Sequence, residues 1–213
     1  VTSYAWIQKT TVSEKGKLEC LPLTAGIGTM PDIEAKWTVD IPEKPDGGGR
    51  ITTSIVQTLP DQTRSLYQSA LASRGLGIGE VAYSMVVNEE GITETKDAVI
   101  EMSVPQEWVK KNGGIIQIKV LRIDDEANAE ILDTAFARYD TDSRYIVFKA
   151  KSPKGLCTFT LVAVKASDGM LTQGSSGEPG IPQAALPDAS GSSILYNVPA
   201  GIQTTLVWII AGI

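Results

Sequence analysis

The segment AVIEMSVPQEWVKKNGGIIQIKVLRIDDEANAEILDTAFARYDTDSRYIVFKAKSPKGLCTFTLVAV, residues 98–164, decides the fold class. Its β-branched and aromatic residues gather in short runs that Gly, Pro, Asn and Asp separate. The first run alternates apolar and polar residues from Ala98 and stops at Pro105. Short strands at this spacing predict an antiparallel β-sandwich or a barrel-like domain. The residues SPKGL, with Pro153 and Gly155, predict a hairpin between the last two strands.

The residues before this segment continue the β pattern. In IEAKWTVDI (33–41) an apolar side chain falls at every second position, which predicts a half-buried strand. Residues 1–23 predict a hairpin around a Glu-Lys-Gly turn, and further strands are expected at 51–59 and 81–88. PEKPDGGGR (42–50) predicts a loop, because its prolines and three consecutive glycines fit neither a helix nor a central strand.

Two short segments carry helix signals. DQTRSLYQSALASRG (61–75) offers Asp61 as an N-cap and Gly75 as a stop. PQEWVKKNGG (105–114) places Pro105 at the first helical position and lysines in the last turn. We therefore expect a mainly β protein with one or two short helices.

The composition divides the chain into four parts. We expect an N-terminal β region over 1–59 that packs on the main domain, and a β domain over 60–166. A Gly/Ser/Pro-rich linker arm follows over 167–193, and a C-terminal β-hairpin for assembly over 194–213. No apolar run reaches the roughly 18–20 residues that a membrane-spanning helix needs, so no membrane span is expected.

Histidine is absent from the 213 residues, and the formal net charge is -6. Histidine is the usual general base near neutral pH and a common metal ligand, so its absence excludes Ser-His-Asp triads, Cys-His dyads and HExxH zinc sites. The negative charge argues against a nucleic-acid partner, because such binding depends on basic residues. We expect no enzyme and no cofactor; a glycosidase that uses carboxylates alone is the weaker option that survives.

Two acidic loops are the only candidates for a metal. One holds Asp124, Asp125 and Glu126, and the other holds Asp140 and Asp142. Neither completes an EF-hand loop, which needs further ligands and a bidentate Glu. We interpret both as solvated turns, with weak calcium bridging between subunits as the alternative.

Cys20 and Cys157 lie far apart in the sequence. In an exported protein a low and even count fits one long-range disulfide, which would constrain the unfolded chain by roughly 4–5 kcal/mol on an entropic account. Two buried thiols, or pairing between neighbouring copies, are the alternatives. A start at Val1 fits an exported protein whose targeting segment has been removed, or an artificially chosen start.

The four tryptophans divide into core and interface candidates. Trp37 and Trp108 are expected in the core, and Trp6 and Trp208 at an interface. The predicted assembly residues are Trp6 and apolar members of the terminal hairpin: Ile194, Leu195, Tyr196, Leu206, Val207, Trp208 and Ile209. The alternative is a monomeric extracellular carbohydrate-binding or adhesion module, which would lose its glycan when Trp6 or Trp208 is replaced.

The order of these elements from about Gly79 to Val164 resembles the archaeal surface-protein family called the PGF-pre-PGF domain. The matching positions are Val104, Pro105, Trp108, Val120, Arg122, Leu132, Thr134, Tyr145, Phe148, Ala150, Pro153, Gly155 and Phe159. Leu156 and Cys157 depart from the aromatic and serine of the family, and no tryptophan precedes Leu132. The first departure makes Cys157 the residue expected to have gained a covalent role.

The resemblance implies an archaeal extracellular protein of the S-layer or envelope kind, without known chemistry. The acidic, histidine-free composition is also similar to that of the sheath proteins of filamentous methanogens. The membrane helix common in the family is missing, which favours a lattice or sheath subunit. We therefore expect a structural subunit that self-assembles through β-strand and disulfide contacts. Its expected partners are copies of itself, with other envelope proteins or glycans as further candidates.

Overall fold

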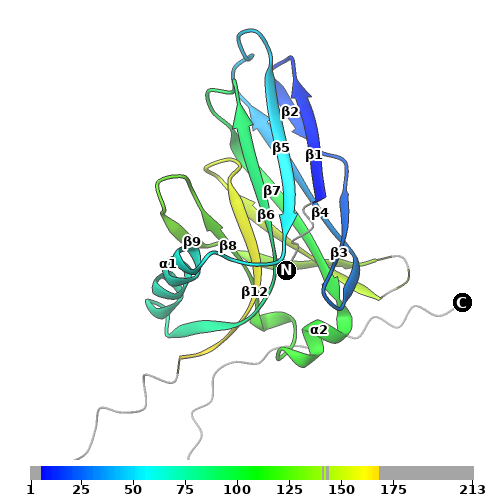
Figure 1. Cartoon of the computed structure of the whole chain (residues 1–213), viewed down its shortest axis with the longest axis vertical. Coiled ribbons are helices and arrows are strands. Elements are labelled where there is room, and N and C mark those ends of the chain that lie inside the picture. The colour runs from blue at the N-terminus through cyan, green and yellow to red at the C-terminus, as the bar shows by residue number, and fades with distance from the viewer. Residues whose placement is uncertain (1–5, 141, 143, 168–213) are drawn as a thin grey trace, which may run out of the picture. The chain divides into compact units, whose positions relative to one another are not determined.

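Two antiparallel sheets face each other in the computed structural model, which describes residues 6–140, 142 and 144–167 (Figure 1). Sheet A has the strand order β1 (Trp6–Val12), β5 (Gly49–Val56), β6 (Leu76–Glu90), β12 (Thr158–Ala166), β8 (Ile118–Ile123) and β9 (Ala129–Ile131). Sheet B has the order β10 (Thr134–Tyr139), β11 (Tyr145–Ser152), β7 (Lys96–Pro105), β4 (Met30–Ile41) and β2 (Gly16–Glu19), and β3 (Leu23–Ile27) also pairs with β4. The expected mainly β sandwich is confirmed.

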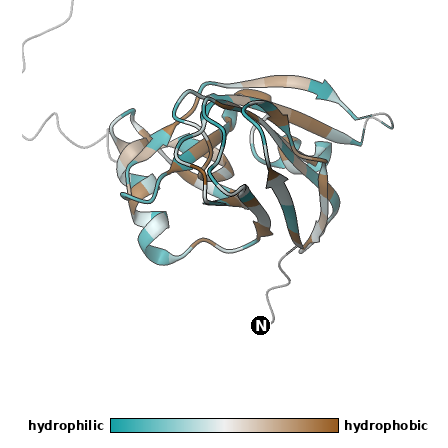
Figure 2. Ribbon diagram, turned by 90° about the horizontal axis from the view of Figure 1, so that it is seen from above, coloured by the Kyte–Doolittle hydropathy of each residue, from teal (hydrophilic) through white to brown (hydrophobic). Residues whose placement is uncertain are grey.

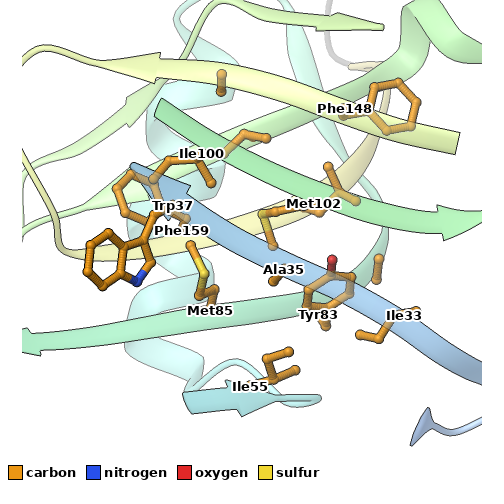
Figure 3. Packing of buried hydrophobic residues seen from close by; sticks show 14 of the residues in the cluster. Ile33, Ala35, Trp37, Ile55, Tyr83, Met85, Ile100, Met102, Phe148 and Phe159 are labelled. Carbon is orange, nitrogen blue, oxygen red and sulfur yellow. The ribbon is translucent and has the colours of Figure 1, made fainter. Parts of the chain in front are cut away.

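The core lies between the inner faces of the two sheets (Figure 3). Strand β4 shows why: its burial alternates along the strand, and the five apolar residues expected on one face are all buried, namely Ile33, Ala35, Trp37, Val39 and Ile41. Successive side chains point to opposite sides of a strand, so β4 of sheet B packs its one apolar face against sheet A.

Both predicted hairpins are wrong, because the chain changes sheet at each of these turns. Strand β1 pairs with β5 in sheet A, whereas β2 pairs with β4 in sheet B. Likewise β11 pairs with β10 and β7, whereas β12 pairs with β6 and β8. The inner faces of β11 and β12, with Phe148 and Phe159, both belong to the core between the sheets. The turn residues reverse the chain direction. Which strand β12 then pairs with is decided by the burial of its inner face between the two sheets.

The expected boundary between residues 59 and 60 does not divide the fold. Sheet A places β1 and β5 beside β6, and sheet B places β4 beside β7, so both sheets contain strands from each side of the boundary. The region 1–59 is thus part of the sandwich and not a separate layer on it. Apart from Ser167, the expected linker 167–193 and the terminal hairpin 194–213 lie outside the described residues.

Two helices accompany the sheets. Helix α1 (Asp61–Ala72) buries Tyr67 and Leu71 in a second apolar cluster on sheet A, and the N-cap is Pro60 instead of the expected Asp61. Helix α2 (Gln106–Lys111) begins one residue later than expected. Pro105 keeps an extended backbone, with ψ 139, as it pairs with Tyr145 in the β7–β11 ladder.

The strand expected at 115–123 begins later. Its first residues form a short 3-10 turn, η1 (Ile115–Gln117), after Gly114, and β8 starts at Ile118. Gly113, with a φ of 88, ends α2: its N–H bonds to the Lys110 oxygen and the Gly114 N–H bonds to the Val109 oxygen.

Candidate functional site

The open edges of the sandwich are the first place to look for function, because an edge strand presents unpaired backbone N–H and C=O groups. Strand β9 has three residues and lies against α1. Strands β2 and β3 share one side of β4 but are interrupted around Pro22. Two longer edges remain, β1 in sheet A and β10 in sheet B.

Strand β10 carries two exposed aromatic side chains. Phe136 lies opposite Phe148, and Tyr139 lies opposite Ile146, in the register with β11. Residues opposite one another in an antiparallel pair share a face, and Phe148 and Ile146 belong to the core, so both β10 aromatics lie on the inner face. Yet Phe136 is 41% and Tyr139 44% exposed.

Sheet B extends further than sheet A on this side, which explains why Phe136 and Tyr139 are exposed. Strand β9 pairs with only three residues of β8, and the Leu132 N–H then bonds to the Val120 oxygen at 3.0 Å before the chain crosses to β10. Thr134 Oγ1 accepts the Val120 N–H at 2.8 Å and marks the crossing point. Beyond it, sheet B continues with a six-residue edge, and the β10–β11 hairpin extends past the other strands at the right of Figure 2.

The two aromatic rings contact each other instead of the core. Their centroids lie 5.1 Å apart at an interplanar angle of 61°, an edge-to-face arrangement that aromatic pairs prefer. A bulge between Phe136 and Arg138 makes this possible, because it brings residues three apart onto one face. We call Phe136 and Tyr139 with the β10 backbone the β10 edge.

The outer face of sheet B is polar by contrast. A row of alternating charges crosses it, with Lys36 Nζ 3.2 Å from Glu19 and 3.7 Å from Glu101, and Glu101 2.6 Å from Arg138 Nη1. The Lys36 and Glu101 side chains are partly buried, at 27% and 16% exposure, and this row of charges makes the middle of the face polar. Phe136 and Tyr139 at the β10 edge form the one contacting pair of exposed large apolar side chains on the described part of sheet B, whereas the exposed Leu21 lies between β2 and β3.

Two hollows adjoin Tyr145 on the same sheet, with volumes of about 370 and 350 Å³. Arg144 and Tyr145 line both of them. The expected acidic loop lies at the first hollow, where Asp140 accepts the Tyr145 N–H at 2.9 Å and Asp142 pairs with Arg144 at 2.9 Å. Burial, then the nearby Asp32 carboxylate, raises the pKa of Tyr145.

The other acidic loop is closed by its own hydrogen bonds. Asp124 accepts both the backbone and side-chain N–H groups of Asn128 and pairs with the buried Arg122 at 3.4 Å. Partial burial of Asp124 acts against ionisation, but these partners outweigh it and lower the pKa of the carboxyl. Among the described residues, no three acidic or sulfur side chains form a group that could hold a metal ion.

Both cysteines are free thiols in the structure, with no bond between them. Cys20 accepts the Trp37 N–H on its Sγ at 3.1 Å, and burial raises its pKa to about 11. Burial raises the pKa of Cys157 to about 12. The structure therefore contains two buried thiols and no internal disulfide, and pairing between neighbouring copies stays a prediction.

The remaining predicted residues fall in different places. Trp37 is fully buried, and Trp108 is buried with its Nε1 donating to Glu80 at 3.0 Å, so both core predictions are confirmed. Trp6 starts β1 opposite Ile55. The predicted assembly residues of 194–213 lie outside the described part. Sequence reasoning missed Phe136 and Tyr139, because their spacing of three breaks the strand period and only a bulge restores it.

Comparisons with known proteins give no relatives for this chain. It matches no family model, and neither curated proteins nor solved structures give a significant match. Within the described residues, neither helix is long and apolar enough to cross a membrane.

Proposed function

We propose that the chain is a structural subunit of an extracellular envelope, a sheath or surface layer, that self-assembles through β-strand contacts. The observation that carries the proposal is the β10 edge. Its backbone lies at the open side of sheet B and its two aromatics are exposed. Natural proteins protect such edges with lysine, proline, a β-bulge or a covering element. The sequence TAFARY has neither Lys nor Pro, and its bulge leaves both aromatics together on one exposed face.

Two sequence features support the same proposal. The order of elements from Val104 to Phe159 resembles an archaeal surface-protein domain, and this resemblance supports an extracellular location. The absence of histidine removes the catalytic arrangements that depend on this residue, which supports a role in forming contacts. The extracellular envelope is therefore the proposed location, with copies of the same chain as partners.

Removal of the terminal residues tests this function. The full chain and a variant that lacks 194–213 are compared by negative-stain electron microscopy and light scattering, with circular dichroism and urea unfolding as fold controls. We expect the full chain to form polymers and the shortened chain to remain a folded monomer. Polymers that persist after the deletion, or a full chain that stays monomeric, would contradict the proposal.

A second candidate function rests on the hollows beside Tyr145. A tyrosine flanked by Arg144 and carboxylates is a chemical setting that suits a glycan, as in a monomeric carbohydrate-binding module. Calorimetry with envelope oligosaccharides tests it. This function predicts binding by a monomer that Arg144→Ala abolishes, whereas a structural subunit predicts polymers with no such binding.

A further inference from the structure

We propose that the β10 edge receives residues 204–210, TTLVWII, of a second copy as an additional strand of sheet B. This inference rests on the proposed function and deepens it, because it names the edge that accepts a strand and the segment that supplies one. The added strand would form main-chain hydrogen bonds with β10 and cover Phe136 and Tyr139.

The acceptor is β10 and not the other long edge, β1. On β1, the exposed Lys9 lies opposite Thr52 on the outer face at the centre of the strand and, among the described residues, has no carboxylate at ion-pair distance, so its charge opposes the approach of an apolar strand. On β10, the only charge of the strand is Arg138, which lies on the outer face and pairs with Glu101 at 2.6 Å. The inner face of β10 instead offers two aromatic rings to the side chains of an incoming strand.

The donor segment has the composition that this edge needs. No charged residue follows Asp188, so the last part of the chain cannot be solvated by ionised side chains. In 204–210 the side chains of Leu206, Trp208 and Ile210 share one face of an extended strand, and this face can lie on the β10 aromatics. The seven residues of the segment also suit the six-residue β10.

The chain between Ser167 and the donor segment 204–210 is long enough for this segment to reach a second copy. Ser167 is the last described residue, and its N–H bonds to the Gly75 oxygen at 3.0 Å. The 36 residues 168–203 that separate it from the donor segment span at most about 130 Å when extended. Donation to a second copy is a head-to-tail contact, which builds rings or filaments as the proposed function requires.

Lysine substitutions at the β10 edge test whether β10 is the strand that accepts the donor segment. The doubly substituted chain Phe136→Lys/Tyr139→Lys is compared with the matched control Ile7→Lys, which adds a lysine at an apolar position of β1 that is 60% exposed. All three positions are exposed, so the fold is expected to survive, and circular dichroism checks it. We expect the double substitution to raise the concentration needed for assembly at least about tenfold, and Ile7→Lys to leave it within about twofold.

The outcomes separate this inference from the proposed function. If deletion of 194–213 abolishes assembly but the β10 substitutions do not, β10 is not the acceptor, although the proposed function stands. If Ile7→Lys blocks assembly instead, β1 is the acceptor and the inference is overturned. If the deletion leaves the polymer intact, the proposed function itself fails.

Engineered disulfide formation tests the donor and the exchange between copies. Chains that carry Ala135→Cys, on β10, are mixed with chains that carry Leu206→Cys or Val207→Cys, and oxidised under native conditions. Free thiols are then blocked before a non-reducing gel. We expect a dimer that contains one chain of each kind, and none when Ile7→Cys replaces Ala135→Cys. A chain with both substitutions that closes on itself at high dilution, with no mixed dimer at assembly concentration, would overturn donation to a second copy.

Discussion

The Trp37 indole Nε1 donates a hydrogen bond of 2.8 Å to the Oγ1 of Thr53, and this bond joins sheet B to sheet A inside the core. Both residues are almost completely buried, at 0% and 1% exposure. Trp37 lies on β4, and Thr53 on β5. This fully buried tryptophan is therefore fixed in position by a polar contact between the sheets, in the region that Figure 3 shows.

Thr53→Val removes the partner of this indole N–H and keeps the side-chain shape. Because the buried donor is then unsatisfied, we expect the free energy of unfolding to fall by about 1–3 kcal/mol. Urea unfolding followed by tryptophan fluorescence measures it. The control is Thr52→Val, on the opposite face of the same strand, which should change stability by less than about 0.5 kcal/mol. Equal losses for the two variants would show that the bond is unimportant.

Gly155 holds the turn at which the chain changes sheet between β11 and β12. Its φ is +79, and a Cβ there would collide with the backbone oxygen and Oγ1 of Thr95. Gly155→Ala should therefore cost about 4 kcal/mol, since it adds a steric collision to backbone strain. The matched control is Gly47→Ala, with φ +77 and open space around the added Cβ, which should cost about 1–2 kcal/mol. Thermal unfolding of the two variants separates the cost of the collision from the cost of backbone strain. If both variants lose the same amount of stability, the collision at Gly155 is ruled out.

The raised pKa values of Cys20 and Cys157 predict inert thiols in the folded chain. With values of about 11 and about 12, only a very small fraction of either group is thiolate near neutral pH, and the thiolate is the reactive form. We expect a disulfide-exchange reagent to label neither cysteine rapidly in the native chain and both after denaturation. Fewer than two thiols in the denatured chain, or cross-linked chains on a non-reducing gel, would instead support the disulfide considered from the sequence.

The half-buried carboxyl of Glu89 predicts a pH-dependent contribution to stability. Burial, with a further contribution from Asp125, raises its pKa, although Thr95 Oγ1 donates a bond to it at 2.7 Å. An acid whose pKa is raised by folding favours the folded state at low pH, and this contribution is lost as pH rises through the folded pKa. Glu89→Gln keeps the Thr95 bond without the charge.

The variant should therefore gain stability relative to the natural chain at about pH 7, and gain less at about pH 4, where the carboxyl is largely protonated. Urea unfolding at both pH values measures the difference. Glu90→Gln is the control, because its side chain is 65% exposed. A difference between Glu89→Gln and the natural chain that does not vary with pH would contradict the assignment.

Local patterns predicted the features that depend on neighbours along the chain. The alternation from Ile33 to Ile41 predicted a strand with one buried face, because successive side chains point to opposite sides. The glycine and proline signals placed the turns correctly, including Gly155. They could not predict the partners of β11 and β12, because a turn reverses the chain without specifying whether the next strand pairs with the previous one or crosses to the other sheet.

The candidate site was less accessible to sequence reasoning than the core. Phe136 and Tyr139 are three residues apart, which in a regular strand places them on opposite faces. The bulge before Arg138 puts them on one face. Their exposure then depends on β9, which ends at Ile131 and leaves the inner side of β10 partly uncovered.

The sequence by itself determined the fold class, the buried face of β4 and the absence of histidine chemistry. Each of these depends only on residue type and on spacing along the chain. The tertiary structure alone decided which strands share a sheet, that Cys20 and Cys157 are buried separately as thiols, and that β10 carries an exposed aromatic pair. Backbone hydrogen bonds are nearly the same for every residue type, so they do not encode a strand's partner. That choice comes from packing between residues far apart in the chain, such as Trp37 and Thr53 across the two sheets.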